Sequence, residues 1–161
     1  MGSKLESAIE KKDEAKEQFE DGIESGEQTV EDMNAVIEGL EGVPDDADDE
    51  IVDLKAEVQE AAEGEAETDF ESNTDTVIET GSEKDQETIS ESQEGKEKAE
   101  EAENAYQEIA SNRFAENASD AAGAAEQNAE LFGETEETAE TDMDEARERA
   151  DELRNELAGF R

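Results

Sequence analysis

The densest group of possible ligands in this sequence is a run of six acidic residues within positions 45–53. Carboxylate oxygens bind Ca²⁺ and Mg²⁺, so a metal site is the first chemistry to consider. A calcium loop of the EF-hand type needs alternating acids and a central Gly, whereas these acids are clustered and contain no Gly. Helical spacing resumes directly afterwards, at Ile51, Leu54, Val58 and Ala62. We therefore interpret the run as a corner before a helix, with Asp46 or Asp48 as the N-cap and no metal ligand.

The residue types that most often carry catalysis are missing or follow no catalytic pattern. The chain has no His and no Cys, which removes the most frequent general base and every thiol nucleophile. Ser and Thr are concentrated in 72–92 without a nucleophile-elbow pattern, so we expect them on a solvated helix surface. We predict no catalytic residue, no cofactor and no small-molecule substrate, and therefore a protein that is not an enzyme.

Charge dominates the composition. Asp and Glu number 53 against 13 Lys and Arg, which gives a formal net charge of −40. Repulsion of this size opposes folding in dilute salt, and Leu, Ile, Val and Phe together make up only about 15% of the chain. Molar salt shortens the Debye length to about 3 Å and weakens the repulsion. The composition resembles that of acidic proteins of haloarchaea and their viruses, which implies a cytoplasmic or virion location.

The spacing of apolar residues predicts an all-α protein made of long antiparallel helices in a bundle or coiled coil. We expect one helical domain over 1–161, with four helices at approximately 3–41, 47–80, 82–132 and 134–160. Gly42, in a left-handed conformation, and Pro44 would end the first helix. Gly81 and Gly133 would end the second and third, with Ser82 as a new N-cap and Asp85 three residues on. Whether the breaks at Gly81 and at Gly95 are real is left open, because the 11 residues from Ile78 to Ile89 also fit a continuous helix.

Narrow seams with an average step of 3.5 residues would hold these helices together, and also offer an interface to partners. The candidate seam residues are Leu5, Ile9, Phe19, Ile23, Val30, Met33, Ile37, Leu40, Met143, Leu153, Leu157 and Phe160. Because the seams are narrow and the core is small, we predict self-association or incorporation into a larger assembly.

Basic residues are concentrated near the two ends of the sequence. Four antiparallel helices would bring both termini to one end of a bundle, and with them the candidate basic end. Its members are Lys4, Lys11, Lys12, Lys16, Arg147, Arg149, Arg154 and Arg161. Two interpretations are open: local pairing with neighbouring acids, or docking of this end on an acidic partner.

Three functions remain after these exclusions. The first is a structural protein of a halophile, a helical component of a larger complex such as a haloarchaeal virus particle. The second is a signalling coiled coil, because the Ala-, Ser-, Thr-, Gln- and Glu-rich heptads of 85–132 resemble the cytoplasmic hairpin of chemoreceptors. The third is an acidic mimic of DNA. The absence of a basic patch and of a long apolar run argues against nucleic-acid binding and membrane insertion.

Overall fold

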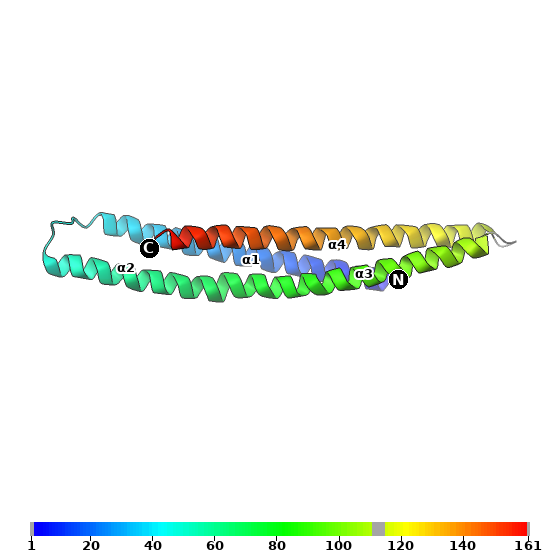
Figure 1. Ribbon diagram of the computed structural model, residues 1–161, viewed down its shortest axis with the longest axis horizontal. Coiled ribbons are helices and arrows are strands. Elements are labelled where there is room, and N and C mark those ends of the chain that lie inside the picture. Colours follow the sequence, from blue (N-terminus) through cyan, green and yellow to red (C-terminus); the bar gives the residue numbers. More distant parts are fainter. Residues whose placement is uncertain (1, 111–114, 161) are drawn as a thin grey trace. The chain divides into compact units, whose positions relative to one another are not determined.

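The computed structural model describes residues 2–110 and 115–160, apart from the side chains of 110, 115 and 116. Every regular element in these residues is a helix, which confirms the predicted all-α class. The elements are α1 (Gly2–Glu41), α2 (Asp49–Asp69), the π-helix η1 (Phe70–Asp75), α3 (Thr76–Ala110) and α4 (Ala115–Ala158) (Figure 1). Because α2, η1 and α3 follow one another without a break, the described residues form three long helical segments.

The chain divides into two compact units. Unit 1 comprises Met1–Glu17 and Gly81–Asp144, and unit 2 comprises Gln18–Thr80 and Glu145–Arg161. Each unit therefore takes one piece from each of the three helical segments. The prediction of a single helical domain stays a prediction.

The first helix ends where the sequence predicts, but by a different backbone geometry. Helix α1 stops at Glu41, directly before Gly42. No glycine in the described ranges has a positive φ, so the predicted left-handed conformation of Gly42 is wrong. The chain instead tightens, and the amide of Val43 donates a hydrogen bond to the carbonyl of Leu40 at 3.0 Å. An i→i−3 bond of this kind is frequent in the last turn of a helix.

The second helix begins at the predicted corner. Asp48 is the N-cap residue of α2, with extended backbone angles (φ −49°, ψ 141°), but its side chain makes no capping hydrogen bond. Its carbonyl accepts the amides of Ile51 (2.8 Å) and Val52 (3.1 Å). Asp49 and Glu50 occupy the first turn, where negative charge interacts favourably with the helix dipole.

The predicted helix ends at Gly81 and Gly133 are wrong, and no break occurs at Gly95. Helix α3 runs through Gly81 and Gly95, and α4 runs through Gly133. A Gly inside a helix costs only about 1 kcal/mol relative to Ala, which packing can offset. At Gly95 the packing is evident, because an added Cβ would lie 2.5 Å from the ring of Phe132.

Each unit has its own apolar core. In unit 2 the buried cluster is Val30, Met33, Ala66, Phe70, Leu153 and Leu157, flanked by Ile23, Ile37, Ala62 and Phe160. In unit 1 it is smaller, with Leu5, Ala8 and Phe132 buried and Ile9 beside them. Both clusters draw on helices that are distant in sequence, so packing between helices holds each unit together.

The predicted seam residues pack inside the chain. Six are buried: Leu5, Phe19, Val30, Met33, Leu153 and Leu157. The other six are half-buried: Ile9, Ile23, Ile37, Leu40, Met143 and Phe160. None of the twelve is exposed, so the packing within the chain already uses most of this apolar surface. Their service as an interface to a partner stays a prediction.

Candidate functional site

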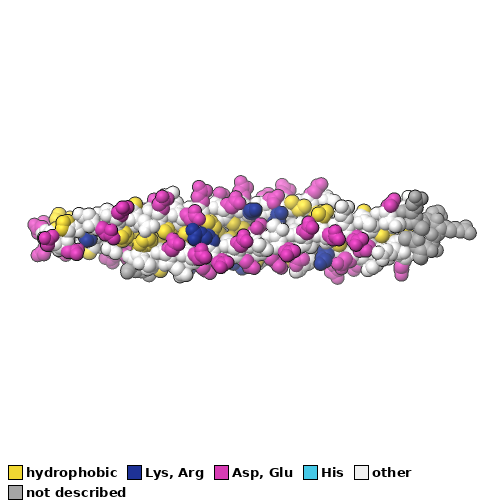
Figure 2. Space-filling model, turned by 90° about the horizontal axis from the view of Figure 1, so that it is seen from above, with side chains coloured by type: hydrophobic (Ala, Val, Ile, Leu, Met, Phe, Trp, Pro, Cys, Tyr) yellow, Lys and Arg dark blue, Asp and Glu magenta, His cyan; other side chains and the backbone are white. Residues whose placement is uncertain are grey.

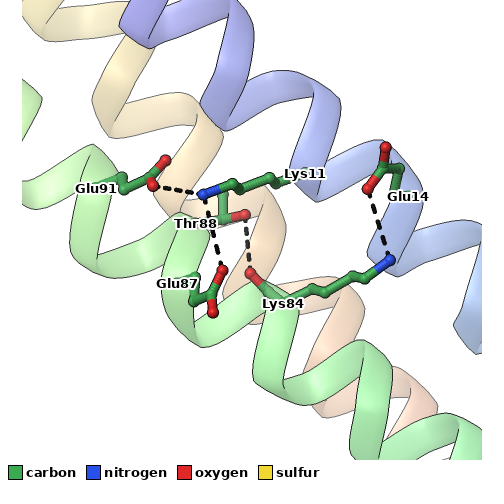
Figure 3. Close-up of polar contacts among 6 residues, drawn as sticks. All are labelled: Lys11, Glu14, Lys84, Glu87, Thr88 and Glu91. Atoms are coloured by element: carbon green, nitrogen blue, oxygen red, sulfur yellow. Dashed lines mark hydrogen bonds and ion pairs between the residues drawn. The ribbon is translucent and has the colours of Figure 1, made fainter.

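The inner face of α3 within unit 1 is lined by small and polar side chains. Its buried positions include a row that alternates in steps of four and three residues: Gly81, Asp85, Thr88, Ser92, Gly95 and Ala99. The expectation that the Ser and Thr side chains of 72–92 are solvated is wrong for the four that are buried: Thr74, Ser82, Thr88 and Ser92. The hydroxyl of Thr88 donates to the carbonyl of Lys84 at 3.1 Å (Figure 3), which satisfies it within its own helix. The spacing of four and three residues could have indicated this buried face in the sequence. It was missed because the residues at that spacing are Gly, Ser, Thr and Asp, which are not typical of a core.

Asp85 is the most unusual of these residues. Its side chain has no exposed surface, and neither carboxylate oxygen has a hydrogen-bond partner. Burial, followed by repulsion from Asp142 on α4, raises the pKa of Asp85 to about 7, although Lys12 on α1 opposes the shift. Asp142 also has one buried oxygen without a partner. The carboxyl group of Asp85 can therefore take up a proton near neutral pH. The predicted capping box of Ser82 and Asp85 is wrong, because both lie inside α3 and are buried.

Ion pairs on the surface of unit 1 connect α1 with α3. Lys11 lies 2.5 Å from Glu91 and 3.7 Å from Glu87, and Lys84 lies 3.5 Å from Glu14 (Figure 3). The hydrogen bond to Glu91 is the main reason that the pKa of Lys11 is raised. All five side chains are at least one-third exposed, and exposed pairs of this kind contribute about 0–1 kcal/mol each. They stabilise the local register of the helices, and Glu91 also lines a groove of about 210 Å³ in unit 1 with Lys4, Ser7, Glu94 and Gly95.

The candidate basic end stays a prediction. That prediction needs four antiparallel helices, whereas α3 continues directly from α2. Its lysines belong to unit 1 and its described arginines to unit 2; Arg161 lies outside the described residues. Arg149 pairs with Glu27 (3.3 Å) and Glu152 (3.1 Å). These contacts favour the interpretation of local pairing.

A second arginine also pairs within unit 2. The guanidinium of Arg154 forms an ion pair with Asp75 and lies 5.7 Å from the centre of the Phe70 ring. A cation over an aromatic face adds about 0.5–1 kcal/mol at an exposed site. A groove of about 410 Å³ follows these residues, with Leu157 and Glu71 among its other walls. Arg154, the cation in its lining, is already paired with Asp75, so we assign the groove no ligand.

The acidic side chains of the corner at 42–54 do not converge as a set of metal ligands. Throughout residues 2–110 and 115–160, no group of three or more His, Cys, Asp or Glu side chains is arranged to hold a metal ion. Lys55 ties the corner to α2, because its ammonium group donates to the carbonyl of Val43 (3.3 Å) and lies 3.4 Å from Asp45. These two contacts join the corner to the first turns of α2.

The clearest candidate for a binding surface lies on α2 in unit 2. Ile51, Leu54 and Val58, which we call the apolar stripe, expose 46, 53 and 50% of their surface. Steps of three and four residues place all three on one face of the helix. Figure 2 shows acidic side chains over the described part of the visible face, with apolar side chains between them. Six large apolar side chains are exposed among the described residues, and three of them form this stripe.

A groove lies beside the apolar stripe. This α1–α2 groove has a volume of about 190 Å³ and is lined by Thr29, Asp32, Met33, Val36, Ala62, Glu65, Ala66 and Asp69. Its floor is apolar and its edges are acidic. No side chain between residues 34 and 65 is buried, so the core of unit 2 ends at Met33 and Ala66 while both helices continue.

Comparisons with family models, with curated proteins and with solved structures find no match to this chain. None of the described helices combines the length and the apolar character needed to cross a membrane.

Proposed function

We propose that this chain is a non-enzymatic structural protein, a helical component of a larger protein assembly. The observation that carries the proposal is the apolar stripe of Ile51, Leu54 and Val58, which lies half exposed among acidic side chains. Monomeric proteins scatter such side chains singly, whereas a continuous apolar surface with a polar rim marks a site of interaction. Association would remove this surface from water.

The finer architecture supports the same role. We infer an antiparallel helical bundle of the coiled-coil type, because buried positions on α3 and α4 recur every three or four residues. On α4 they include Ala118, Ala122, Ala125, Ala129 and Phe132. Small residues let helices approach closely, but they bury little apolar area. Since each Å² of buried apolar surface contributes only about 25 cal/mol to stability, such a core stabilises the fold weakly. A chain with such a small core gains stability from a partner.

We also infer that the assembly works in concentrated salt. A net charge of −40 on 161 residues is tolerable where the screening length is about 3 Å. Only nine ion pairs join the described side chains, far fewer than the acidic residues they would have to neutralise. A haloarchaeal cell or virus particle fits these requirements.

Sedimentation equilibrium in 2–4 M KCl tests this function. We expect the average mass to rise above the 17.6 kDa of one chain as the concentration increases. A variant with Leu54→Ser and Val58→Ser should stay at the monomer mass, because it lacks two of the three side chains of the apolar stripe. A wild-type mass that stays at one chain over the whole concentration range would contradict assembly by this surface.

A further inference from the structure

We propose that the α1–α2 groove of unit 2 binds an amphipathic helix of another protein, one with apolar side chains on one face and Lys or Arg along its edges. This inference rests on the proposed function and names the partner that the same surface accepts. Three observations carry it: an apolar floor, acidic edges, and a length that matches a short helix.

The floor of the groove extends from the core of unit 2 towards the corner. On α1 it begins at Met33 and Val36, and Leu40 lies four residues further on the same face. On α2 it begins at Ala62, and Val58 precedes Ala62 by four residues on the same face. The apolar stripe therefore continues the α2 wall of the groove. Helix-binding grooves are recognised by apolar anchors at i, i+3, i+4 and i+7, and this surface offers the complementary rows.

The edges of the groove determine which helix it accepts. Asp32 lies on the α1 side, and Glu65 and Asp69 lie on the α2 side. Within 36–60 there are ten acidic residues and a single basic one, Lys55. That lysine is already hydrogen bonded to the carbonyl of Val43. In a pair of copies the acidic edges would face each other, which weakens self-association through this surface relative to binding of a foreign helix. Lys or Arg at the edges of a foreign helix would instead form ion pairs.

The length of the surface sets the length of the partner. From Ile51 to Asp69 the α2 wall spans about 27 Å at 1.5 Å per residue. A helix of about 18 residues, or five turns, covers this distance. Such a helix would cover the apolar stripe and the groove together.

A synthetic peptide provides the probe. We would use an 18-residue labelled peptide with Leu at i, i+3, i+4 and i+7 positions and Lys on both sides of them, at a salt concentration where circular dichroism shows the chain to be helical. Binding is followed by fluorescence anisotropy. Two control peptides are a scrambled sequence of the same composition and a version with Glu in place of Lys. We expect each control to bind at least about tenfold more weakly.

Matched protein variants locate the site. The double variant Leu54→Ser, Val58→Ser should weaken peptide binding at least about tenfold. Leu131→Ser on α4 is the control, because Leu131 is also exposed (38%) but belongs to unit 1. It should bind within about twofold of the wild type. Hydrogen exchange should show protection of 33–40 and 51–69 when the peptide is bound.

Three results would overturn the inference. The first is that the scrambled peptide binds as tightly as the amphipathic peptide, which would show that charge alone attracts the peptide. The second is an unchanged affinity of the double variant. The third is self-association through the apolar stripe that the peptide does not displace, which would make a second copy the occupant while the proposed function stands. Peptide binding by a chain that stays monomeric in sedimentation would support the inference and contradict the self-association expected above.

Discussion

Replacement of Asp85 by Asn tests whether the polar inner face of α3 is as enclosed as the structure indicates. The Asp85→Asn side chain has nearly the same shape as the protonated acid but stays neutral at every pH. In the wild type the carboxyl group is fully buried, has no hydrogen-bond donor, and faces Asp142 and Lys12. The two proteins should therefore be similar in stability when Asp85 is protonated and differ when it is ionised.

The sign and the magnitude follow from the two pKa values of Asp85. The folded value of about 7 is higher than the ordinary value of 3.8 for an Asp side chain, so the folded state binds the proton more tightly. Stability is then greatest below about pH 4, decreases as the pH rises, and is constant above about pH 7. A difference of about three units corresponds to about 4 kcal/mol. Movement of the flexible Lys12 towards the ionised carboxylate would reduce this loss of stability, so we expect Asp85 ionisation to cost about 2–4 kcal/mol.

Thermal unfolding in 2 M KCl, followed by circular dichroism, measures the effect. A series from pH 5 to pH 8 stays above the isoelectric point of about 4.1 and covers about 2.6 kcal/mol of the full change. Relative to the wild type, the melting temperature of Asp85→Asn should rise by about 2–4 °C for each kcal/mol. Most of that gain should develop between pH 5 and pH 7.

Asp144→Asn is the matched control. Asp144 lies on α4 in the same unit and is exposed, so this change removes one charge without affecting a buried group. Its stability relative to the wild type should vary by less than about 0.5 kcal/mol over the series. The remaining acids titrate in all three proteins, and their contribution cancels. If the difference between wild type and Asp85→Asn were the same at pH 5 and pH 8, the carboxyl group would be solvated and the described burial would be wrong.

Three further predictions concern packing and salt. Gly95→Ala should destabilise unit 1 by about 1–3 kcal/mol in thermal melts, because its Cβ would lie 2.5 Å from the Phe132 ring; Gly123→Ala, which meets nothing within 4 Å, should stabilise it by about 1 kcal/mol. Equal effects of the two substitutions would contradict this packing. Leu153→Ala should cost about 2–5 kcal/mol in urea unfolding, because this side chain is 1% exposed in the core of unit 2; a loss below about 1 kcal/mol would contradict it. The helical signal in circular dichroism at 222 nm should decrease when the KCl concentration is lowered below roughly 0.5 M, because the surface acids then repel one another. An unchanged spectrum in dilute buffer would contradict the role assigned to salt.

Helix α1 and the C-terminal part of α4, after Gly133, were the most predictable parts of the fold. Their seams include large apolar residues such as Met33, Leu153 and Leu157, which are buried as expected. Large apolar side chains at a step of 3.5 residues have few alternatives to a helix-packing face, so their spacing is informative without a structure. The corner at 42–48 was equally clear, because Pro44 cannot continue a helix.

The middle of the chain was less predictable because its seam is made of residues with two common uses. Ser and Gly frequently cap or end helices, and the same small side chains line faces where helices approach closely. Ser82 and Gly81 look like a helix boundary in the sequence, yet both are buried inside α3. Only the helix packed opposite distinguishes the two uses, and that helix is remote in sequence.

Gly95 illustrates this dependence on a distant partner. It lies on α3, and the ring of Phe132 on α4 occupies the space that a side chain would need. Neither residue alone indicates a close approach: Gly95 resembles a helix end, and Phe132 resembles an ordinary core residue. Their pairing fixes the register of α3 against α4, and that register carries Asp85 inward, to a buried position where Asp142 on α4 influences it. In a chain whose seams are made of small residues, helix register rather than apolar content decides which polar groups are buried. An Ala at position 95 should therefore displace α3 or the Phe132 ring and also shift the pKa of Asp85.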